Sequence, residues 1–352
     1  MFIFYRHAKS SRKIWIFAAL IIGFSLSHFY DLYFLEQTPF NELLITHKLL
    51  RKCKSGTREL NFLKLGGEYF ADYDNPRTLN DKVGYIFHNY YCKSPITEYL
   101  NNKYTLKKII ANLVGKEYVV KLLGVWNKAS DIEWNKLPNC FVLKTVRGCH
   151  GRQVIVVKNK SKIDITETIN KLENFCKTVR SMKNIKENRI IAEEYLENFD
   201  QSNVIDYKFF CSFGKVLFAY CLSTEKENNN SHNVNADNKT LSFYSLPEWN
   251  VLPFTTDGRK NNDLPKPKHL EKMIMLAEKI SKHFPLIRVD LYECGDRVLV
   301  GELTDDPSGA KSIFKPVIWD FKLGEMIDTP TLDQINAIIE DDKNNYVNAI
   351  TK

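Results

Sequence analysis

Residues 283–309, HFPLIRVDLYECGDRVLVGELTDDPSG, constrain the fold most, because they predict two strands joined by a tight turn. Residues 285–292 are apolar and β-branched, residues 293–296 supply the turn, and residues 297–303 alternate apolar with small or charged side chains. We therefore expect an antiparallel hairpin here.

The hairpin carries two carboxylates, Asp290 and Glu302, each followed by a leucine. Because an isolated buried carboxylate is unfavourable, such a pair normally meets a cation, either a side chain or a metal. Carboxylate oxygens suit Mg²⁺, which commonly joins one or two carboxylates to substrate phosphates. The alternative is a structural sheet edge at which Asp290 pairs with Arg288 or Arg297 while Glu302 faces water.

The composition is that of a folded globular protein. The chain has 352 residues, 44% hydrophobic and 26% charged, which is enough for two or three structural units. Its net charge of +8 is spread along the chain, which favours anionic ligands in general, and we expect no nucleic-acid partner. The absence of a Walker loop, a GxGxxG motif and a GxSxG motif argues against P-loop, dinucleotide and serine-hydrolase chemistry.

The N-terminus contains an almost uninterrupted apolar run at residues 14–30, preceded by a basic tail at residues 1–13. A membrane-spanning helix needs roughly 20 apolar residues, and the bulky residues that follow do not resemble a cleavage site. We predict a single-pass signal anchor at residues 14–34 with a cytosolic N-terminus. The alternative is a buried helix, and basic residues at 48–54 leave the side of the membrane that holds the body open.

Changes of periodicity divide the rest of the chain. Residues 35–75 have the pattern of a helix-prone connector, and residues 76–135 that of a mainly helical subdomain. From residue 136 to 197 the pattern changes to strands, and residues 198–352 form a C-terminal subdomain that includes the hairpin. The order of elements predicts an α+β protein.

A glycine-containing turn, RGCHGRQ at residues 147–153, follows one predicted strand and precedes another. Backbone NH groups in such a turn can hold phosphate oxygens. Arg147, His150 and Arg152 add positive charge to it. The alternative is an ordinary surface hairpin.

Six motifs in a fixed order resemble the TupA-like ATP-grasp family, named for a teichuronopeptide biosynthesis protein. They are PRTLNDK at 76–82, NKYTLKKI at 102–109, LPNCFVLK at 137–144, IIAEEYL at 190–196, DYKFF at 206–210, and IRVDLY with GELTDDPSG at 287–292 and 301–309. The resemblance covers roughly residues 70–330. It implies an ATP-grasp fold in which two α+β lobes clasp ATP.

The resemblance also implies nucleotide-binding residues. Lys103 and Lys144 would contact the ATP phosphates. The lid over them would contain Arg147, Gly148, His150 and Gly151. The hinge that holds adenine and ribose would contain Glu193, Glu194, Tyr195 and Leu196.

For the reacting groups, the resemblance implies that Lys208 and Arg288 face the transferred phosphoryl group. The residues that would hold Mg²⁺ are Asp290, Glu302, Thr304 and Asp305. Thr304 stands where related ligases often have asparagine, and the lid reads Arg-Gly-Cys-His-Gly in place of His-Gly-Ser-Gly. The first lysine also follows Asn102 where the family usually has aspartate.

The implied activity is ATP-dependent ligation of a carboxylate to an amine through an acyl phosphate, with Mg²⁺ and lysines neutralising the phosphoryl charge. The implied acceptor is a cell-surface polysaccharide or its precursor, modified with an amino acid or peptide. Two alternatives stay open. One is a membrane-anchored glycosyltransferase, because a signal anchor followed by a basic globular body is a common layout of such enzymes; its Asp-x-Asp metal motif could only be Asp72-Tyr73-Asp74, which lies in a polar connector and not after an apolar strand. The other is a non-catalytic ATP-grasp-like binding subunit with an altered lid.

Overall fold

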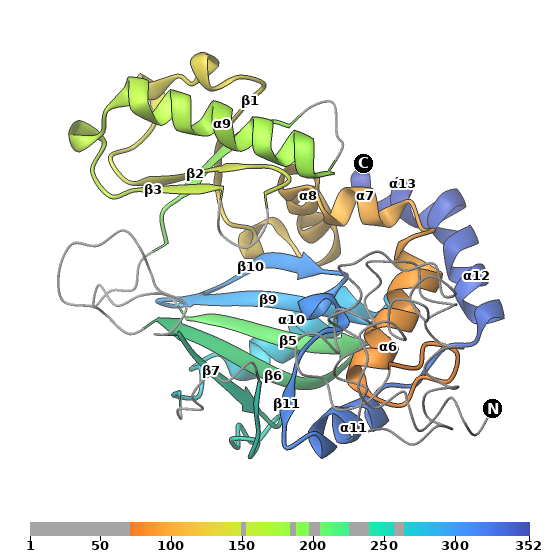
Figure 1. Ribbon diagram of the computed structural model, residues 1–352. Helices are drawn as coiled ribbons and strands as arrows, with labels where there is room; N and C mark the ends of the chain where they lie inside the picture. Colours follow the sequence, from red (N-terminus) through yellow and green to blue (C-terminus); the bar gives the residue numbers. More distant parts are fainter. Residues whose placement is uncertain (1–70, 149–152, 184–187, 197–204, 225–238, 257–263) are drawn as a thin grey trace, which may run out of the picture. The chain divides into compact units, whose positions relative to one another are not determined.

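The computed structural model describes residues 71–148, 153–183, 188–196, 205–224, 239–256 and 264–352. All of them belong to the second of two units into which the chain divides, which begins at Ala71. The predicted anchor, most of the predicted connector, and His150 and Gly151 of the predicted lid lie outside the described residues. The described part contains three antiparallel sheets, of five, four and two strands, with helices packed around them (Figure 1), which confirms the α+β class.

The larger sheet has five antiparallel strands in the order β10-β9-β5-β6-β7. Their bounds are β5 Asp206–Ser212, β6 Lys215–Thr224, β7 Lys239–Tyr244, β9 Ile287–Cys294 and β10 Arg297–Thr304. The hairpin predicted at residues 283–309 is confirmed, because β9 pairs with β10. Between β5 and β6, Phe213 and Gly214 both have positive φ, as a two-residue hairpin turn requires.

One face of this sheet belongs to the main hydrophobic core. Ile287, Val289 and Leu291 alternate along β9 and are fully buried, together with side chains of helix α10, Leu270–Ser281. Burying each such side chain contributes about 1.5–3 kcal/mol. The residues between them on β9 point to the opposite face, which carries the charged groups described below.

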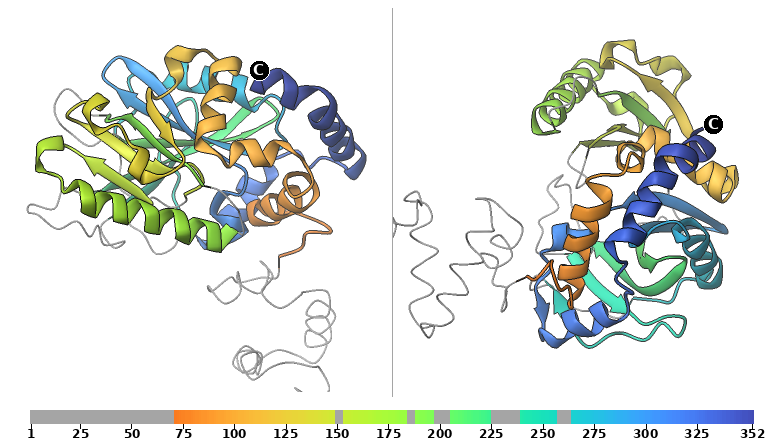
Figure 2. Two further views of the ribbon diagram at one scale, coloured as in Figure 1. Left: turned by 90° about the horizontal axis from the view of Figure 1, so that it is seen from above. Right: turned by 90° about the vertical axis from the view of Figure 1, so that its right-hand side faces the viewer.

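The smaller sheet has four antiparallel strands in the order β1-β4-β2-β3. Their bounds are β1 Leu122–Trp126, β2 Phe141–Thr145, β3 Val154–Val157 and β4 Ile190–Glu194. Helix α9, Ile165–Lys183, lies along this sheet (Figure 2) and buries Leu172 in a second, separate hydrophobic core.

Residues 76–135, predicted to be mainly helical, also contain the strand β1, which the sequence analysis did not predict. The run LLGVW is short and apolar throughout, and periodicity alone cannot distinguish such a run from part of a buried helix. Its tertiary context decides the outcome, since β1 pairs with β4, with Trp126 opposite Ile190.

The helices that precede the smaller sheet are α6 Leu79–Ile86, α7 Ile96–Leu100 and α8 Lys103–Leu113, with a π-helical turn at Phe87–Tyr91. Thr78 caps α6 in a reciprocal arrangement with Asp81. Asn80 bonds to Asp320 of helix α11, Ile318–Glu325, through its backbone NH and its side chain. The PRTLNDK motif is therefore accounted for by packing between α6 and α11.

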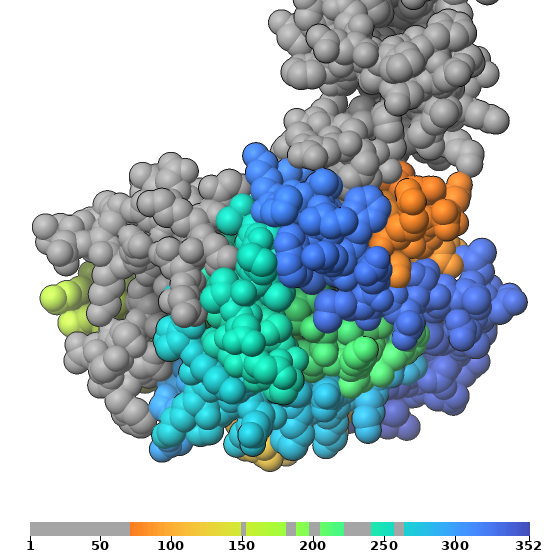
Figure 3. Space-filling model, turned by 90° about the horizontal axis from the view of Figure 1, so that it is seen from below, coloured from red at the N-terminus to blue at the C-terminus, as the bar shows by residue number. Residues whose placement is uncertain are grey.

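The chain ends with helices α12, Leu332–Asp341, and α13, Val347–Thr351, joined by a π-helical turn at Asp342–Tyr346. Strands β8, Thr255–Thr256, and β11, Phe314–Lys315, form a two-stranded sheet before them. Figure 3 shows the face on which β7, α11 and α6 reach the surface. Every helix of the described part is too short or too polar to cross a bilayer.

Candidate functional site

A row of charged side chains crosses the larger sheet. Glu302 of β10 is opposite Asp290 of β9, and Asp290 is opposite Lys208 of β5. Because residues two apart on a strand share a face, Arg288 and Asp206 lie on the same face as this row. Five predicted or newly found charged groups therefore come together on one surface of the sheet.

Asp290 is almost completely buried, at 1% exposure, and its two oxygens bind two cations. Arg288 donates from Nε to Oδ1 at 2.6 Å and from Nη2 to Oδ2 at 2.7 Å, and Lys208 donates to Oδ2 at 2.5 Å. Burial alone would raise the pKa of the Asp290 carboxyl, but the Arg288 and Lys208 cations lower it below its ordinary value. Asp290 is thus a buried anion paired with Arg288, as the structural alternative predicted, and also with Lys208.

Asp206 is a member of this cluster that the sequence analysis missed. Its Oδ2 accepts from Lys208 Nζ at 2.6 Å, while its enclosed Oδ1 has no hydrogen-bond partner. Burial raises the pKa of Asp206 to about 6, against the opposing effect of Lys208. The signal was present in the DYK motif, because Asp206 and Lys208 are two residues apart on a predicted strand and must share a face.

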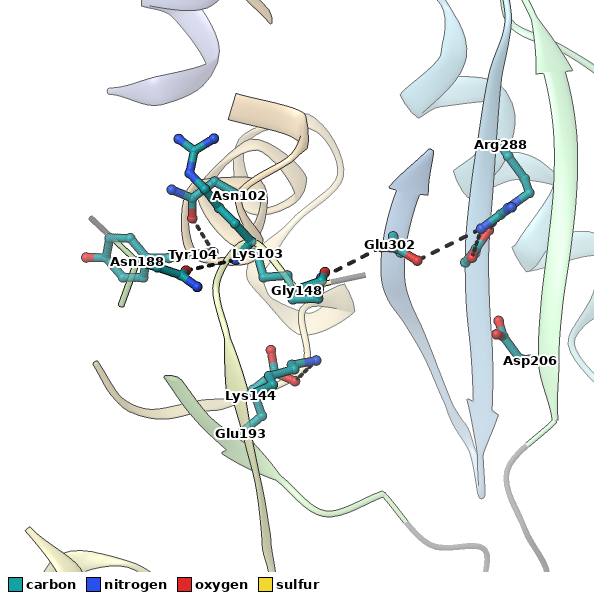
Figure 4. A network of polar contacts seen from close by, with 12 residues as sticks. Asn102, Lys103, Tyr104, Lys144, Gly148, Asn188, Glu193, Asp206, Arg288 and Glu302 are labelled. Carbon is teal, nitrogen blue, oxygen red and sulfur yellow. Dashed lines mark hydrogen bonds and ion pairs between the residues drawn. The ribbon is translucent and has the colours of Figure 1, made fainter. Parts of the chain in front are cut away.

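Glu302 differs from Asp290, because its side chain is 45% exposed. Lys103 and Arg288 approach it from two sides, each with a nitrogen 3.9 Å from one of its oxygens (Figure 4). A bulge between Val300 and Glu302 shifts the register so that Glu302 is opposite Asp290. Gly301 is required at the bulge, because a Cβ there would lie 2.3 Å from the Tyr292 ring.

Lys103 is the first residue of α8, and the backbone around it is well anchored. Asn102 caps the helix by accepting from Tyr104 N at 3.0 Å, a role that asparagine fills as well as aspartate does. Lys103 donates its backbone NH to Val146 at 2.8 Å and its Nζ to the Gly148 carbonyl at 2.6 Å. These bonds bring the start of α8 against the described end of the predicted lid.

A small pocket of about 50 Å³ joins three of the predicted residues. Its lining consists of Leu100, Asn101, Lys103, Leu106, Gly148, Glu302 and Leu303. Pockets that hold whole ligands are typically about 300–1,000 Å³. The predicted phosphate lysine and the predicted metal carboxylate therefore face one enclosed space, which is too small here to hold a nucleotide.

Lys144 and Glu193 meet on the smaller sheet. They lie on the paired strands β2 and β4, and Lys144 Nζ forms an ion pair with Glu193 Oε2. Lys107 of α8, which the sequence analysis did not single out, binds the other oxygen at 2.8 Å. Burial would raise the pKa of Glu193, but Lys144 and Lys107 together lower it below its ordinary value.

The remaining hinge residues make contacts of their own. Glu194 forms a two-oxygen ion pair with Arg297 of β10 at 3.2 Å and also accepts from Lys121 N at 3.0 Å. The Tyr195 ring lies 5.8 Å from Lys158 Nζ. Leu196 ends the described part of this segment. Arg297 is therefore engaged with the predicted hinge and not with Asp290.

The other residues predicted for the lid and the Mg²⁺ site contact neighbouring side chains. Arg147 forms an ion pair with Glu98 of α7. Thr304 lies opposite Arg288, and the buried Asp305 accepts from Asn101 Nδ2 at 2.9 Å. Within the described ranges, no three His, Cys, Asp or Glu side chains are grouped as a protein-only metal site.

The Asp72-Tyr73-Asp74 segment, which has the Asp-x-Asp pattern of many glycosyltransferases, lies in a turn before α6. Asp72 Oδ1 accepts from the backbone NH groups of Asp74 at 3.1 Å and Asn75 at 3.0 Å. This is the local hydrogen bonding that aspartate commonly makes in turns. The local structure explains this aspartate without a metal.

Comparison with solved structures finds likenesses at low identity. N5-carboxyaminoimidazole synthetase from Staphylococcus aureus, complexed with ADP, is 16% identical over 60% of this chain and 46% of its own, with a TM-score of 0.36. D-alanine–D-alanine ligase from Bacillus anthracis is 16% identical over 69% of each chain, with a TM-score of 0.42. L-amino acid ligase from Bacillus licheniformis is 15% identical over 60% and 44%, with a TM-score of 0.39.

The chain thus spans about half the length of the first of these proteins. A comparison with curated proteins found no match. A family model described as TupA-like ATPgrasp matches residues 88–328, which include both sheets and every predicted site residue. The chain belongs to the TupA-like ATP-grasp family.

Proposed function

We propose that the protein is an ATP-dependent carboxylate–amine ligase. The observation that carries this proposal is the meeting of Lys103, Gly148 and Glu302 around one pocket. Lys144 is tied to the helix that begins at Lys103, because Glu193 binds both Lys144 and Lys107. Family membership supports the same activity. Basic side chains on one lobe and a half-exposed carboxylate on the other suit a nucleotide whose phosphates carry a divalent cation.

The carboxylates fit Mg²⁺ that arrives with the nucleotide better than a resident ion. Glu302 presents a half-exposed carboxylate, with Asp290 directly opposite it. Mg²⁺ commonly takes one or two protein carboxylates and completes its shell with phosphate oxygens and water. Bound there, the ion would neutralise charge on the phosphates. Asp290 would have to exchange a bond to Arg288 or Lys208 to reach it.

In the proposed reaction, a substrate carboxylate attacks the γ-phosphorus of ATP, giving an acyl phosphate and ADP. An amine then attacks the acyl carbon, phosphate leaves with the bonding electrons, and the amine loses a proton as the amide forms. Lys103 and Lys144 would neutralise the phosphate oxygens during transfer. Arg288 is held by Asp290 at the sheet face, where its guanidinium lies within reach of Glu302.

We further propose that the substrate is a cell-surface polysaccharide or its precursor, and that residues 14–34 anchor the protein in a membrane. The family resemblance supports the first statement and the apolar run supports the second. Membrane fractions washed with alkaline carbonate should retain the full-length protein. Introducing two arginines in the run, L20R and I22R, should release it. Retention of this variant would contradict the anchor.

The first experiment is calorimetric titration of the full-length protein with ATP, with and without Mg²⁺. We expect Mg²⁺-dependent binding that Glu302→Gln weakens about tenfold or more, because one charged contact is lost. Glu248→Gln, at an exposed carboxylate, is the matched control and should bind as wild type does. ADP release should then require both a carboxylate and an amine. A wild-type protein that ignores ATP but binds a nucleotide sugar would overturn the proposal.

A further inference from the structure

Glu193 is a single buried carboxylate shared by two lysines, one on each oxygen. Lys144, from the neighbouring strand β2, binds Oε2, and Lys107, from helix α8, binds Oε1 at 2.8 Å. The Glu193 side chain is only 6% exposed. The two lysines and the one carboxylate together carry a net charge of one positive unit. Most of this charge is buried.

The presence of Lys107 in this cluster needs an explanation, because Lys144 alone could neutralise Glu193. It lies one helical turn after Lys103, so both lysines project from the same side of α8. Its Nζ also donates to the Val120 carbonyl at 2.7 Å, and its side chain is 13% exposed. Burying a second cation is unfavourable, and burial lowers the pKa of Lys107 against the opposing effect of Glu193. One lysine would have sufficed to neutralise Glu193.

A second cation matters if Lys144 has to change partner. With Lys144 as its only counter-ion, Glu193 would become an unpaired buried anion each time Lys144 turned to a phosphate, and breaking a buried pair in this way is strongly unfavourable. With Lys107 in place, Glu193 keeps one ion pair throughout. Lys144 is then free to exchange a carboxylate oxygen for a phosphate oxygen.

We propose that Lys107 is a positioning residue that keeps Glu193 neutralised and thereby makes Lys144 available to the ATP phosphates. The proposal rests on the nucleotide-binding function proposed above. It assigns a role to a residue that does not itself touch the nucleotide. It also makes Glu193 a holder of Lys144, and not a direct ligand of adenine.

The test is a double-mutant cycle on Lys107 and Glu193, with Mg²⁺–ATP affinity as the measured quantity. Lys107→Met should weaken binding about ten- to hundredfold, because Glu193 then holds Lys144 alone. In the E193Q background, the same Lys107→Met change should alter affinity by no more than about threefold, since no carboxylate competes for Lys144. Lys107→Arg should retain most of the wild-type affinity. Lys108→Met, at the exposed neighbouring lysine, is the control.

Two results would overturn the proposal. The first is K107M binding Mg²⁺–ATP as wild type does. The second is an equal loss in both backgrounds, which would mean that Lys107 acts directly on the nucleotide or only on folding. Urea unfolding of each variant accompanies the titration, so that a loss of folded protein is not counted as a loss of affinity.

A second measurement needs no nucleotide and separates this inference from the proposed function. Lys144 acetylation by acetic anhydride is followed by mass spectrometry, normalised to the exposed Lys268 in the same digest. In K107M, Lys144 should react several-fold more slowly, because Glu193 then binds Lys144 alone and holds its Nζ away from the reagent. In the double variant the rate should recover. Unchanged Lys144 reactivity would refute the inference whether or not ATP binds. A wild type that ignores ATP, together with slower Lys144 acetylation in K107M, would refute the proposed function and leave the control of Lys144 by Lys107 standing.

Discussion

The two sheets carry charge clusters that mirror each other. On the larger sheet, one lysine, Lys208, lies between two acids, Asp206 and Asp290. On the smaller sheet, one acid, Glu193, lies between two lysines. With Arg288 and Glu302 included, the larger-sheet cluster has one negative charge in excess at neutral pH, and the smaller-sheet cluster has one positive charge in excess. The first suits a metal cation and the second suits a phosphate.

The clusters also differ in how their partners are held. Asp290 is paired with a residue of its own strand and with one directly opposite it, so the strand register fixes the whole group. Glu193 draws its partners from a strand and from a helix, which are separate elements. We infer that the larger-sheet cluster is permanent, whereas the smaller-sheet cluster can lose one partner and still keep the other.

The largest expected effect is a loss of stability when the charge cluster on the larger sheet is broken. Asp290→Ala leaves Arg288 and Lys208 without their shared counter-ion in a buried place. It should lower the free energy of unfolding by about 3–5 kcal/mol, as measured by urea denaturation. Asp296→Ala, in the exposed turn of the same hairpin, should leave the unfolding midpoint unchanged. A loss of less than about 1 kcal/mol for Asp290→Ala would mean that the two cations find other partners.

The second effect concerns binding and not stability. Lys103→Met should weaken Mg²⁺–ATP binding about ten- to hundredfold, because one charged contact to phosphate is removed. The unfolding midpoint should change little, since the start of α8 is held by the Lys103 backbone NH and by the Asn102 cap, which this substitution keeps. Calorimetry would measure the Mg²⁺–ATP affinity and urea unfolding the stability of the same samples, which separates a loss of binding from a loss of folded protein. Equal affinity of Lys103→Met and Lys108→Met would remove Lys103 from the phosphate site.

The third prediction uses pH to distinguish the clusters. The folded-state pKa of Glu193 is lowered, so its stabilising contribution is present above its unfolded value of about 4.3 and is lost as the pH falls. The folded-state pKa of Asp206 is raised to about 6, so its ionisation costs stability as the pH rises from about 4 through 6. Both contributions to stability can be measured by urea unfolding at several pH values of three proteins: wild type, Glu193→Gln and Asp206→Asn.

Glu193 and Asp206 affect the free energy of unfolding in opposite directions as the pH falls. As the pH falls from about 7 to 4, wild type should gain stability relative to Asp206→Asn, because the folded-state pKa of Asp206 is raised to about 6. As the pH falls further, from about 4 to 3, wild type should lose stability relative to Glu193→Gln, because the folded-state pKa of Glu193 is lowered. Parallel pH profiles for the two variants would contradict the mirrored arrangement. Alanine at either position is less informative, because it also removes packing.

The smallest effect is expected at the ion pair between the sheets. Arg297 is 50% exposed and pairs with Glu194. Arg297→Ala should lower the unfolding free energy by at most about 1 kcal/mol, and added salt should reduce the difference further. An effect as large as that of Asp290→Ala would mean that contact between the sheets, and not burial of charge, dominates stability.

The sequence predicted what lies along a single strand or hairpin. The alternation in residues 285–303 placed Asp290 and Glu302 on paired strands, and the structure confirms that they are directly opposite each other. The same alternation could have identified Asp206 two residues before Lys208. The match of the family model confirms the family assignment made from the six motifs.

What the sequence did not predict depends on contacts between distant elements. Nothing in NKYTLKKI indicates that Lys107 meets Glu193, because that pairing requires α8 and β4 to be placed side by side. The strand at Leu122–Trp126 was missed for the same reason, since its partner lies more than 60 residues away in the chain. The roles assigned to the hinge, lid and metal residues stay predictions, and His150 and Gly151 lie outside the described residues.

The last helix has a consequence for how the protein is made. Asn112 of α8 donates to the Ile350 carbonyl of α13 at 2.9 Å, and the fully buried Asp342 accepts from Ser94 and from His283, at 2.6 Å in the latter case. The helix that carries Lys103 and Lys107 is thus packed against residues that lie far later in the chain, with 238 positions between Asn112 and Ile350. A nascent chain that has not yet reached α13 lacks this support, so the packing around the site is completed only after that segment has been synthesised.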